Sequence, residues 1–276
     1  MSRRFTQVDV FASAPYQGNA LAVVLDGDGL TADEMQRFAR WTNLAETTFL
    51  LPPTTPDADY RVRIFTTESE LPFAGHPTLG SCHAWLEAGG EPRAAGEVVQ
   101  ECEVGLVRLR VSDDGLAFQA PPLIRSGPVD EDLLVRIAES LGIGRADVVA
   151  AEWADNGPGW VGVLLADAAA VLALRPGAVP VDVGVVGPYP AGEPVAFEVR
   201  AFTPYQGATV EDPVTGSLNA SLAQWLLRTG RATAPYLASQ GTAIGRAGRI
   251  HVSAGAEGDV WVGGAVLTCV TGRVAL

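Results

Sequence analysis

The stretch that decides the fold is Gly75-His-Pro-Thr-Leu-Gly-Ser-Cys-His-Ala84, because a related stretch recurs as Glu211-Asp-Pro-Val-Thr-Gly-Ser-Leu-Asn-Ala220. Each follows a strand-like run, Arg63-Ile-Phe-Thr66 or Arg200-Ala-Phe-Thr203, with a one-residue difference in spacing. The separation of about 136 residues is far longer than a solenoid repeat of roughly 20 to 50 residues. We infer a duplicated domain. A chance match is the alternative, since small residues are common in this chain.

Two predicted helices, Pro77–Ala88 and Gly216–Thr229, are rich in small residues and apolar nearly all round, which is typical of buried helices. Strand-like runs dominate the remaining sequence, and many alternate in hydrophobicity between Gly, Pro or Asp residues. Strands around a buried helix, twice over, favour an α+β fold over an alternating parallel sheet. We predict one domain at 1–122 and a second at 123–267, with the C-terminal strand 268–276 as a candidate addition to the first.

Further elements follow from local patterns. Thr31-Ala-Asp-Glu34 is a capping box that predicts a helix ending at Asn43. A second amphipathic helix is predicted at Asp130–Leu141, closed by Gly142. The predicted strands are 6–11, 20–25, 47–51, 60–65, 97–101, 106–111, 117–119, 160–165, 195–202, 249–253 and 259–267.

Composition excludes several classes of function. The 276 residues are 47% hydrophobic, and a net charge of −13 opposes binding to nucleic acid. All 19 basic residues are Arg, which removes Schiff-base and phosphate-loop lysine chemistry. The three Cys and three His lack the spacing of a zinc or disulfide framework. No apolar run approaches the roughly 20 residues of a membrane span. The first nine residues have no apolar run, so we expect that they are not a secretory signal. We expect a soluble cytoplasmic protein.

His76 and Asp212 each precede a Pro at the expected start of a buried helix. Pro is favoured at the first helical position and Asp at the N-cap, so a packed histidine and a capping aspartate are the simple interpretations. The functional interpretation is that both helix amino termini face one cleft between the domains and offer N–H groups to an anionic substrate. Gly75 and Gly216 would permit close approach of the backbone.

Glu46 is the third candidate, because it opens the apolar strand Thr47-Thr-Phe-Leu-Leu51. A carboxyl among apolar neighbours has a raised pKa, which suits a group that must both give and take a proton. A solvated glutamate at a strand edge is the alternative. Glu70 and Glu211 are interpreted as loop acids. Ser217 lacks the Gly-x-Ser-x-Gly elbow of hydrolases.

Together, a series of motifs resembles the PhzF-type phenazine-biosynthesis isomerases, in the right order from the first strand to beyond residue 250. The motifs are Asp9-Val-Phe11 with Gly18-Asn19, Asn43-Leu-Ala-Glu-Thr-Thr-Phe49, Glu70-Leu-Pro-Phe-Ala-Gly-His-Pro-Thr-Leu-Gly80, Glu211-Asp-Pro-Val-Thr-Gly-Ser217, and Gln240-Gly with Arg246-x-Gly-Arg249.

The resemblance implies a diaminopimelate-epimerase-like fold of two pseudo-twofold-related domains, each a mostly antiparallel barrel-like sheet around a central helix. It implies that Glu46 shuttles a proton within trans-2,3-dihydro-3-hydroxyanthranilate, without cofactor or metal, in a homodimer. His76, Asp212 and Ser217 would contact this small anionic cyclic substrate, with backbone from Gly75 and Gly216.

Two other functions remain open, and a third is excluded. The two-thiol racemases that share the fold need a Cys at each helix start, and neither motif has one. An isomerase or C–C bond-cleaving enzyme of another natural-product pathway is the main alternative, and Ala45 replaces the Ser that is more usual in the family. From a different class, a small-acid-binding protein without turnover is the other.

Overall fold

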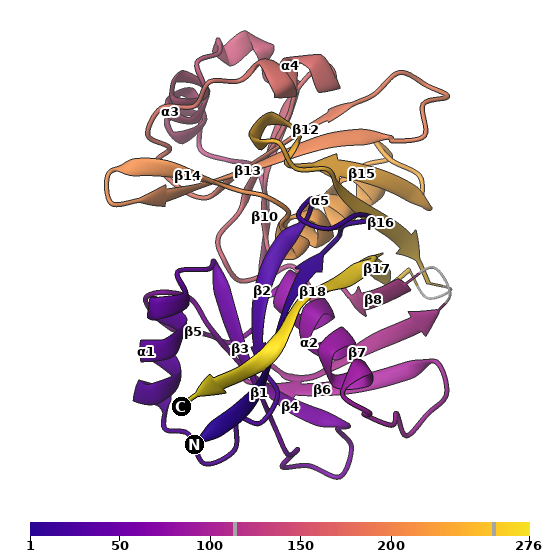
Figure 1. Ribbon diagram of the computed structural model, residues 1–276. Coiled ribbons are helices and arrows are strands. Elements are labelled where there is room, and N and C mark those ends of the chain that lie inside the picture. Colours follow the sequence, from indigo (N-terminus) through magenta and orange to yellow (C-terminus); the bar gives the residue numbers. More distant parts are fainter. Residues whose placement is uncertain (113–114, 256–257) are drawn as a thin grey trace. The chain divides into compact units, whose positions relative to one another are not determined.

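The computed structural model describes residues 1–112, 115–255 and 258–276 of the chain. It divides into two compact units, which Figure 1 shows in sequence colours. The first unit comprises Met1–Gln119 and Gly263–Leu276, and the second comprises Ala120–Val262. Both contain many strands and few helices, so the predicted α+β class is confirmed. No helix in the described ranges combines the length and the apolar character that a membrane crossing requires.

The first unit is a largely antiparallel sheet with two helices. Its elements are β1 (Ser2–Val10), β2 (Asn19–Val24), α1 (Ala32–Thr42), β3 (Glu46–Leu51), β4 (Tyr60–Phe65), β5 (Glu70–Leu71), α2 (Gly75–Glu87), β6 (Glu97–Cys102), β7 (Gly105–Ser112), β8 (Gly115–Gln119) and β18 (Val266–Ala275).

Strand pairing in the first unit places α2 at its centre. β1 pairs antiparallel with β2 and with β18, so the C-terminal strand belongs to this unit. β2 runs parallel to β3, β3 pairs antiparallel with β4, and β4 pairs antiparallel with β5 and parallel to β6. α2 contacts β1, β2, β3, β6, β8 and β18, and most of its residues are buried. The predicted central helix is therefore present.

The second unit adds shorter helices at its periphery. Its elements are β9 (Arg125–Gly127), α3 (Glu131–Leu141), η1 (Arg145–Asp147), β10 (Ala150–Asp155), β11 (Val161–Leu164), α4 (Ala168–Ala173), β12 (Val183–Pro188), β13 (Phe197–Tyr205), β14 (Ala208–Asp212), α5 (Gly216–Arg228), β15 (Tyr236–Gln240), η2 (Thr242–Ile244), β16 (Gly248–Ala254) and β17 (Val260–Gly264), in which the unit ends.

The second unit repeats the pairing order of the first. β10 pairs antiparallel with β9 and β11, β11 runs parallel to β12, and β12 pairs antiparallel with β13. β13 then pairs antiparallel with β14 and parallel to β15, as β4 does with β5 and β6. Strand order, direction and the position of the buried helix agree, which supports a duplicated domain.

The predicted helix-by-helix alignment, however, is wrong. Pro77 is the third residue of α2, whereas Pro213 precedes α5. The equivalent segments are Glu70-Leu-Pro-Phe-Ala-Gly75 and Glu211-Asp-Pro-Val-Thr-Gly216, each ending on the first residue of its helix. The cause is a longer hairpin between β13 and β14, since Phe202 pairs with Glu211 nine residues on and Phe65 pairs with Glu70 five residues on. His76 therefore corresponds to Ser217.

Two peripheral helices match their predictions. Thr31 caps α1 and Glu34 completes the capping box, while Asn43 ends the helix in the left-handed region with φ 57°. Asp130 caps α3, and Gly142 ends it with φ 74°. The predicted strand 259–267 is two strands instead, because the chain passes from β17 to β18 at Ala265.

Gly80 lets α2 approach the sheet closely, and its replacement by alanine tests that packing. An added Cβ would lie 2.6 Å from Leu21 Cδ2 and 2.9 Å from Val8 Cγ2, and both side chains are fully buried. Helix propensity alone favours alanine by about 1 kcal/mol. We expect instead a loss of about 1 to 3 kcal/mol in the free energy of unfolding, measured in urea.

The matched control is Gly272→Ala in β18, where an added Cβ would meet no atom within 4 Å. Its stability should stay within about 0.5 kcal/mol of the parent protein. A Gly80→Ala protein as stable as this control would contradict the close packing of α2.

Candidate active site

Glu46 and His76 meet in the first unit. Glu46 is the first residue of β3, and His76 is the second residue of α2. His76 Nε2 lies 3.2 Å from Glu46 Oε2, with 5% of the histidine side chain exposed and 17% of the glutamate side chain. Two of the candidates chosen from sequence are thus brought together, and the carboxyl keeps a limited opening to solvent.

Local structure explains why a carboxylate stands there. α1 ends at Asn43 in the left-handed conformation, which turns the chain toward β3 within three residues. β3 then runs parallel to β2 with Glu46 opposite Leu21, and its next residues are buried. Glu46 therefore lies at the start of an apolar strand rather than along a solvated edge.

His76 is a neutral imidazole in this setting. Burial lowers its pKa to about 3 from the ordinary 6.5. Its second nitrogen, Nδ1, lies 3.4 Å from Asn19 Nδ2. Because a neutral imidazole has one donor and one acceptor nitrogen, His76 can contact a carboxylate on one side and an amide N–H on the other.

The segment before Asn19 is held by a buried aspartate. Asp9 Oδ2 accepts from Gln17 N at 2.8 Å, and both carboxyl oxygens accept from Gly18 N at 3.1 Å. Gly18 cannot be replaced without movement, since a Cβ there would lie 2.1 Å from Val10 O. The Asp9 and Gly18-Asn19 motifs therefore form one structural unit beside His76.

In the second unit, Asp212 is the last residue of β14 and not the cap of α5. The N-cap is Thr215, whose hydroxyl donates to Asp212 Oδ2. Gln240, fully buried, holds this segment, because its Nε2 donates to Asp212 O and its Oε1 accepts from Thr215 N at 3.0 Å each. The sequence resemblance included Gln240 but assigned it no role.

Ser217 occupies the position in α5 that His76 occupies in α2. Its hydroxyl oxygen accepts from Trp160 Nε1 at 3.2 Å, and its carbonyl accepts from Asn156 Nδ2 at 2.8 Å. Since the hydroxyl accepts from the indole, its own proton is the group it can donate. Neither Trp160 nor Asn156 was singled out by sequence.

The two buried helices start differently from the peripheral ones. Side chains of Thr31, Asp130 and Asp167 cap α1, α3 and α4. Within the described residues no side chain caps α2 or α5, which begin at Gly75 and Gly216. The first amides of a helix carry partial positive charge and bind anions. Both starts are thus suited to a carboxylate ligand.

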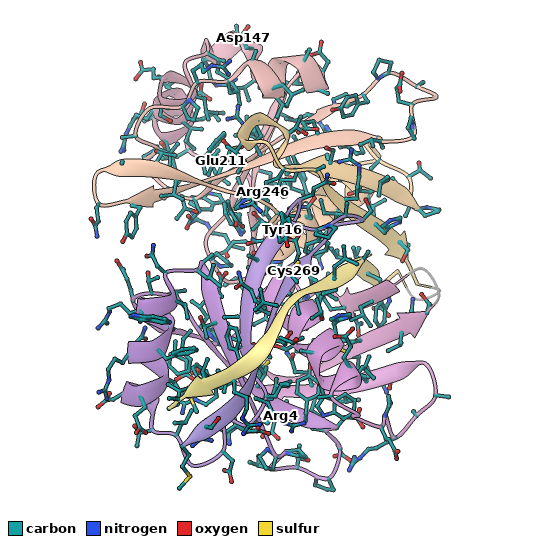
Figure 2. All side chains as sticks on the ribbon, viewed as in Figure 1. Arg4, Tyr16, Asp147, Glu211, Arg246 and Cys269 are labelled. Carbon is teal, nitrogen blue, oxygen red and sulfur yellow. The ribbon has the colours of Figure 1, made fainter. Side chains whose placement is uncertain are left out.

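An equivalent ion pair precedes each of these helix starts. Arg63 donates to both carboxyl oxygens of Glu70 at 2.7 and 2.6 Å, and Arg200 donates to both of Glu211 at 2.9 and 2.7 Å. Arg200 also donates to the carbonyl oxygens of Val171 and Leu174. The interpretation of Glu70 and Glu211 as loop acids is therefore wrong. Both lie in strands, and Figure 2 labels Glu211 in β14.

The candidate residues are divided between the units. Glu46, His76 and Gly75 belong to the first, and Asp212, Ser217 and Gly216 to the second. That both sets face one cleft stays a prediction. Among the described residues, no group of three or more His, Cys, Asp or Glu side chains is arranged to hold a metal ion.

Comparison with known proteins gives a family. The family model described as "Phenazine biosynthesis-like protein" matches residues 8–272. Trans-2,3-dihydro-3-hydroxyanthranilate isomerase from Pseudomonas aeruginosa is 35% identical over 269 residues, covering 93% of this chain and 92% of the relative. Antisense-enhancing sequence 1 from Schizosaccharomyces pombe is also 35% identical, over 98% of this chain and 97% of the relative.

Solved structures show the same fold. A PhzF-family phenazine biosynthesis protein from Bacillus anthracis superimposes with a TM-score of 0.81 at 22% identity, over the whole of both chains. A hydroxyproline epimerase from Agrobacterium vitis gives a TM-score of 0.60 at 14% identity, over 99% of this chain and 91% of the epimerase. The predicted epimerase-like fold is confirmed.

Replacing Arg200 by methionine tests the ion pair in the second unit. The side chains of Arg200 and Glu211 are 5% and 12% exposed, so the change leaves a carboxylate buried without its partner. We expect a loss of about 3 kcal/mol in the free energy of unfolding. Arg4→Met is the control, because Arg4 and Asp26 are 50% and 40% exposed and their pair should contribute about 1 kcal/mol or less. Equal losses would show that the Arg200 pair is not structural.

Acidification tests the neutral state of His76. The unfolded chain binds a proton below pH 6.5 that the folded chain takes up only near pH 3. Folded stability therefore falls as pH falls through this window, by up to about 1.4 kcal/mol per pH unit. Between about pH 7 and about pH 5, urea unfolding of the parent protein should lose about 2 kcal/mol more than that of His76→Gln. Identical pH dependence in the two proteins would mean that His76 is not held neutral.

Proposed function

This chain belongs to the phenazine biosynthesis-like family, and from that membership we propose that it is an isomerase in which one glutamate moves a proton. The substrate we propose is a small cyclic unsaturated carboxylic acid of the trans-2,3-dihydro-3-hydroxyanthranilate type. Curated relatives at about 35% identity carry the name of an isomerase of that compound, which supports the reaction class.

The contact between Glu46 and His76 is the observation that carries the proposal. A shuttle needs one group that accepts a proton from carbon and returns it, held where neighbours do not take the proton away. His76 does not compete, because burial keeps its pKa at about 3. The neutral ring can therefore stay 3.2 Å from Glu46 while the glutamate carries the proton.

The proposed reaction balances without an added reactant. Glu46 takes a proton from one ring carbon, and the electron pair of that C–H bond delocalises into the conjugated system. Protonated Glu46 then delivers a proton to a different carbon of the same system, and the double bonds shift accordingly. The substrate gains and loses one proton, and the carboxylate is restored.

Stabilisation of the developing negative charge is assigned to the helix starts. Helix N–H groups aimed at developing charge lower the barrier because they need no reorganisation. We assign Ser217 and the first amides at Gly75 and Gly216 to the substrate carboxylate, and Asp212 to a polar substituent. The side chain of Asp212 is oriented by the Thr215 hydroxyl and its backbone by Gln240, which supports this role.

Replacing Glu46 by glutamine tests the proposal. General acid–base catalysis contributes about 10²- to 10⁴-fold, so turnover of trans-2,3-dihydro-3-hydroxyanthranilate followed by proton NMR should fall by at least about 100-fold. Glu91→Gln makes the same change at an exposed position of the first unit and should leave turnover unchanged.

Two results would overturn parts of this assignment. A Glu46→Gln protein that turns over at the parent rate would remove Glu46 from the chemistry. A folded parent protein that is stabilised by the compound but does not convert it would mark the chain as a binding protein for such acids.

A further inference from the structure

We propose that Asn19 is a positioning residue that fixes the tautomer of His76, so that Nδ1 accepts from the Asn19 amide and the ring proton lies on Nε2, facing Glu46. The inference rests on the proposed function only for its catalytic consequence. The tautomer itself is a property of the resting protein.

The imidazole ring of His76 carries a single proton. A neutral imidazole has one N–H, and burial keeps this ring neutral. His76 Nε2 lies 3.2 Å from Glu46 Oε2, a close polar contact without the geometry of a hydrogen bond. The proton is therefore either on Nε2, which faces Glu46, or on Nδ1, which faces Asn19.

Asn19 decides between the two nitrogens. Asn19 Nδ2 lies 3.4 Å from His76 Nδ1, and Asn19 is 2% exposed. An amide nitrogen donates, whereas an aspartate of the same shape would only accept. Nδ1 is therefore the acceptor nitrogen, and the ring proton is left on Nε2, beside Glu46.

The backbone keeps Asn19 in place. Asn19 is the first residue of β2 and pairs with Val10 of β1. Just before it, the amide groups of Gln17 and Gly18 donate to the Asp9 carboxylate. Asn19 therefore acts from a rigid strand end rather than from a loose loop, as a positioning group needs.

Aspartate at position 19 should reverse the arrangement. A carboxylate beside Nδ1 draws a proton onto that nitrogen. The ring becomes either an imidazolium between two carboxylates or the Nδ1–H tautomer, whose Nε2 accepts instead of donating. In both states Glu46 loses the N–H of a neutral ring beside it, and proton return to substrate slows.

The test is ¹⁵N NMR of the histidine rings in the full-length protein. The chain has three histidines, so the spectrum of His76→Gln assigns the His76 signals by their absence. Near neutral pH the parent protein should show a protonated Nε2 and an unprotonated Nδ1. A protonated Nδ1 in the parent protein would overturn the inference, whether or not any variant folds.

Two variants extend the test. Asn19→Asp should show a protonated Nδ1 and a kcat at least about tenfold lower. KM should change less than kcat, because the substrate still binds. Gln206→Glu is the control, since Gln206 is exposed and the same amide-to-carboxylate change there adds the same charge. An Asn19→Asp protein with an unprotonated Nδ1, or with an unchanged kcat, would contradict the positioning role.

The outcomes separate this inference from the proposed function. A parent protein with the Nε2–H tautomer that converts no cyclic acid would defeat the proposed function and leave the assigned tautomer standing. A parent protein that turns over through Glu46 but carries its proton on Nδ1 would leave the function standing and defeat the inference.

Discussion

A carboxylate held 3.2 Å from a histidine that burial keeps neutral is the contact on which the rest of this structure depends. To bury His76, α2 must lie inside the sheet, and Gly80 permits that close approach. To bring Glu46 to the ring, α1 must end at Asn43 and turn directly into β3. An imidazole of ordinary pKa would disrupt the arrangement, because it would compete with the glutamate for the proton.

The duplicated architecture gives each unit the same support for its central helix. In both, an Arg on one strand holds a Glu on the next with two hydrogen bonds, and a Glu-x-Pro-x-x-Gly segment leads into the uncapped helix. What differs is the second helical residue, which is His76 in one unit and Ser217 in the other. Equivalent positions thus carry different chemistry: an imidazole beside a glutamate in the first unit, and a hydroxyl donor in the second.

Sequence patterns predicted the fold class and the capped helices, because capping and hydrophobic periodicity are local. Glu46 and His76 were separate candidates, which only the family resemblance placed at one site. The patterns missed β10, whose Ala150-Ala-Glu-Trp-Ala-Asp155 has little β-propensity and is a strand through its pairing with β9 and β11. They also misaligned the repeat, since the longer β13–β14 hairpin shifts the second helix relative to its preceding strand. Ion-pair partners such as Arg200 and Glu211 are eleven residues apart and meet only through strand pairing.

The most direct test of the central claim is the transfer of solvent deuterium to ring carbon. Parent protein and Glu46→Gln would be incubated in D₂O with trans-2,3-dihydro-3-hydroxyanthranilate and followed by NMR. The account predicts that the parent protein introduces deuterium at a single ring carbon as product forms, and that the variant does so no faster than buffer alone. Incorporation at equal rates in both proteins would contradict a proton shuttle at Glu46.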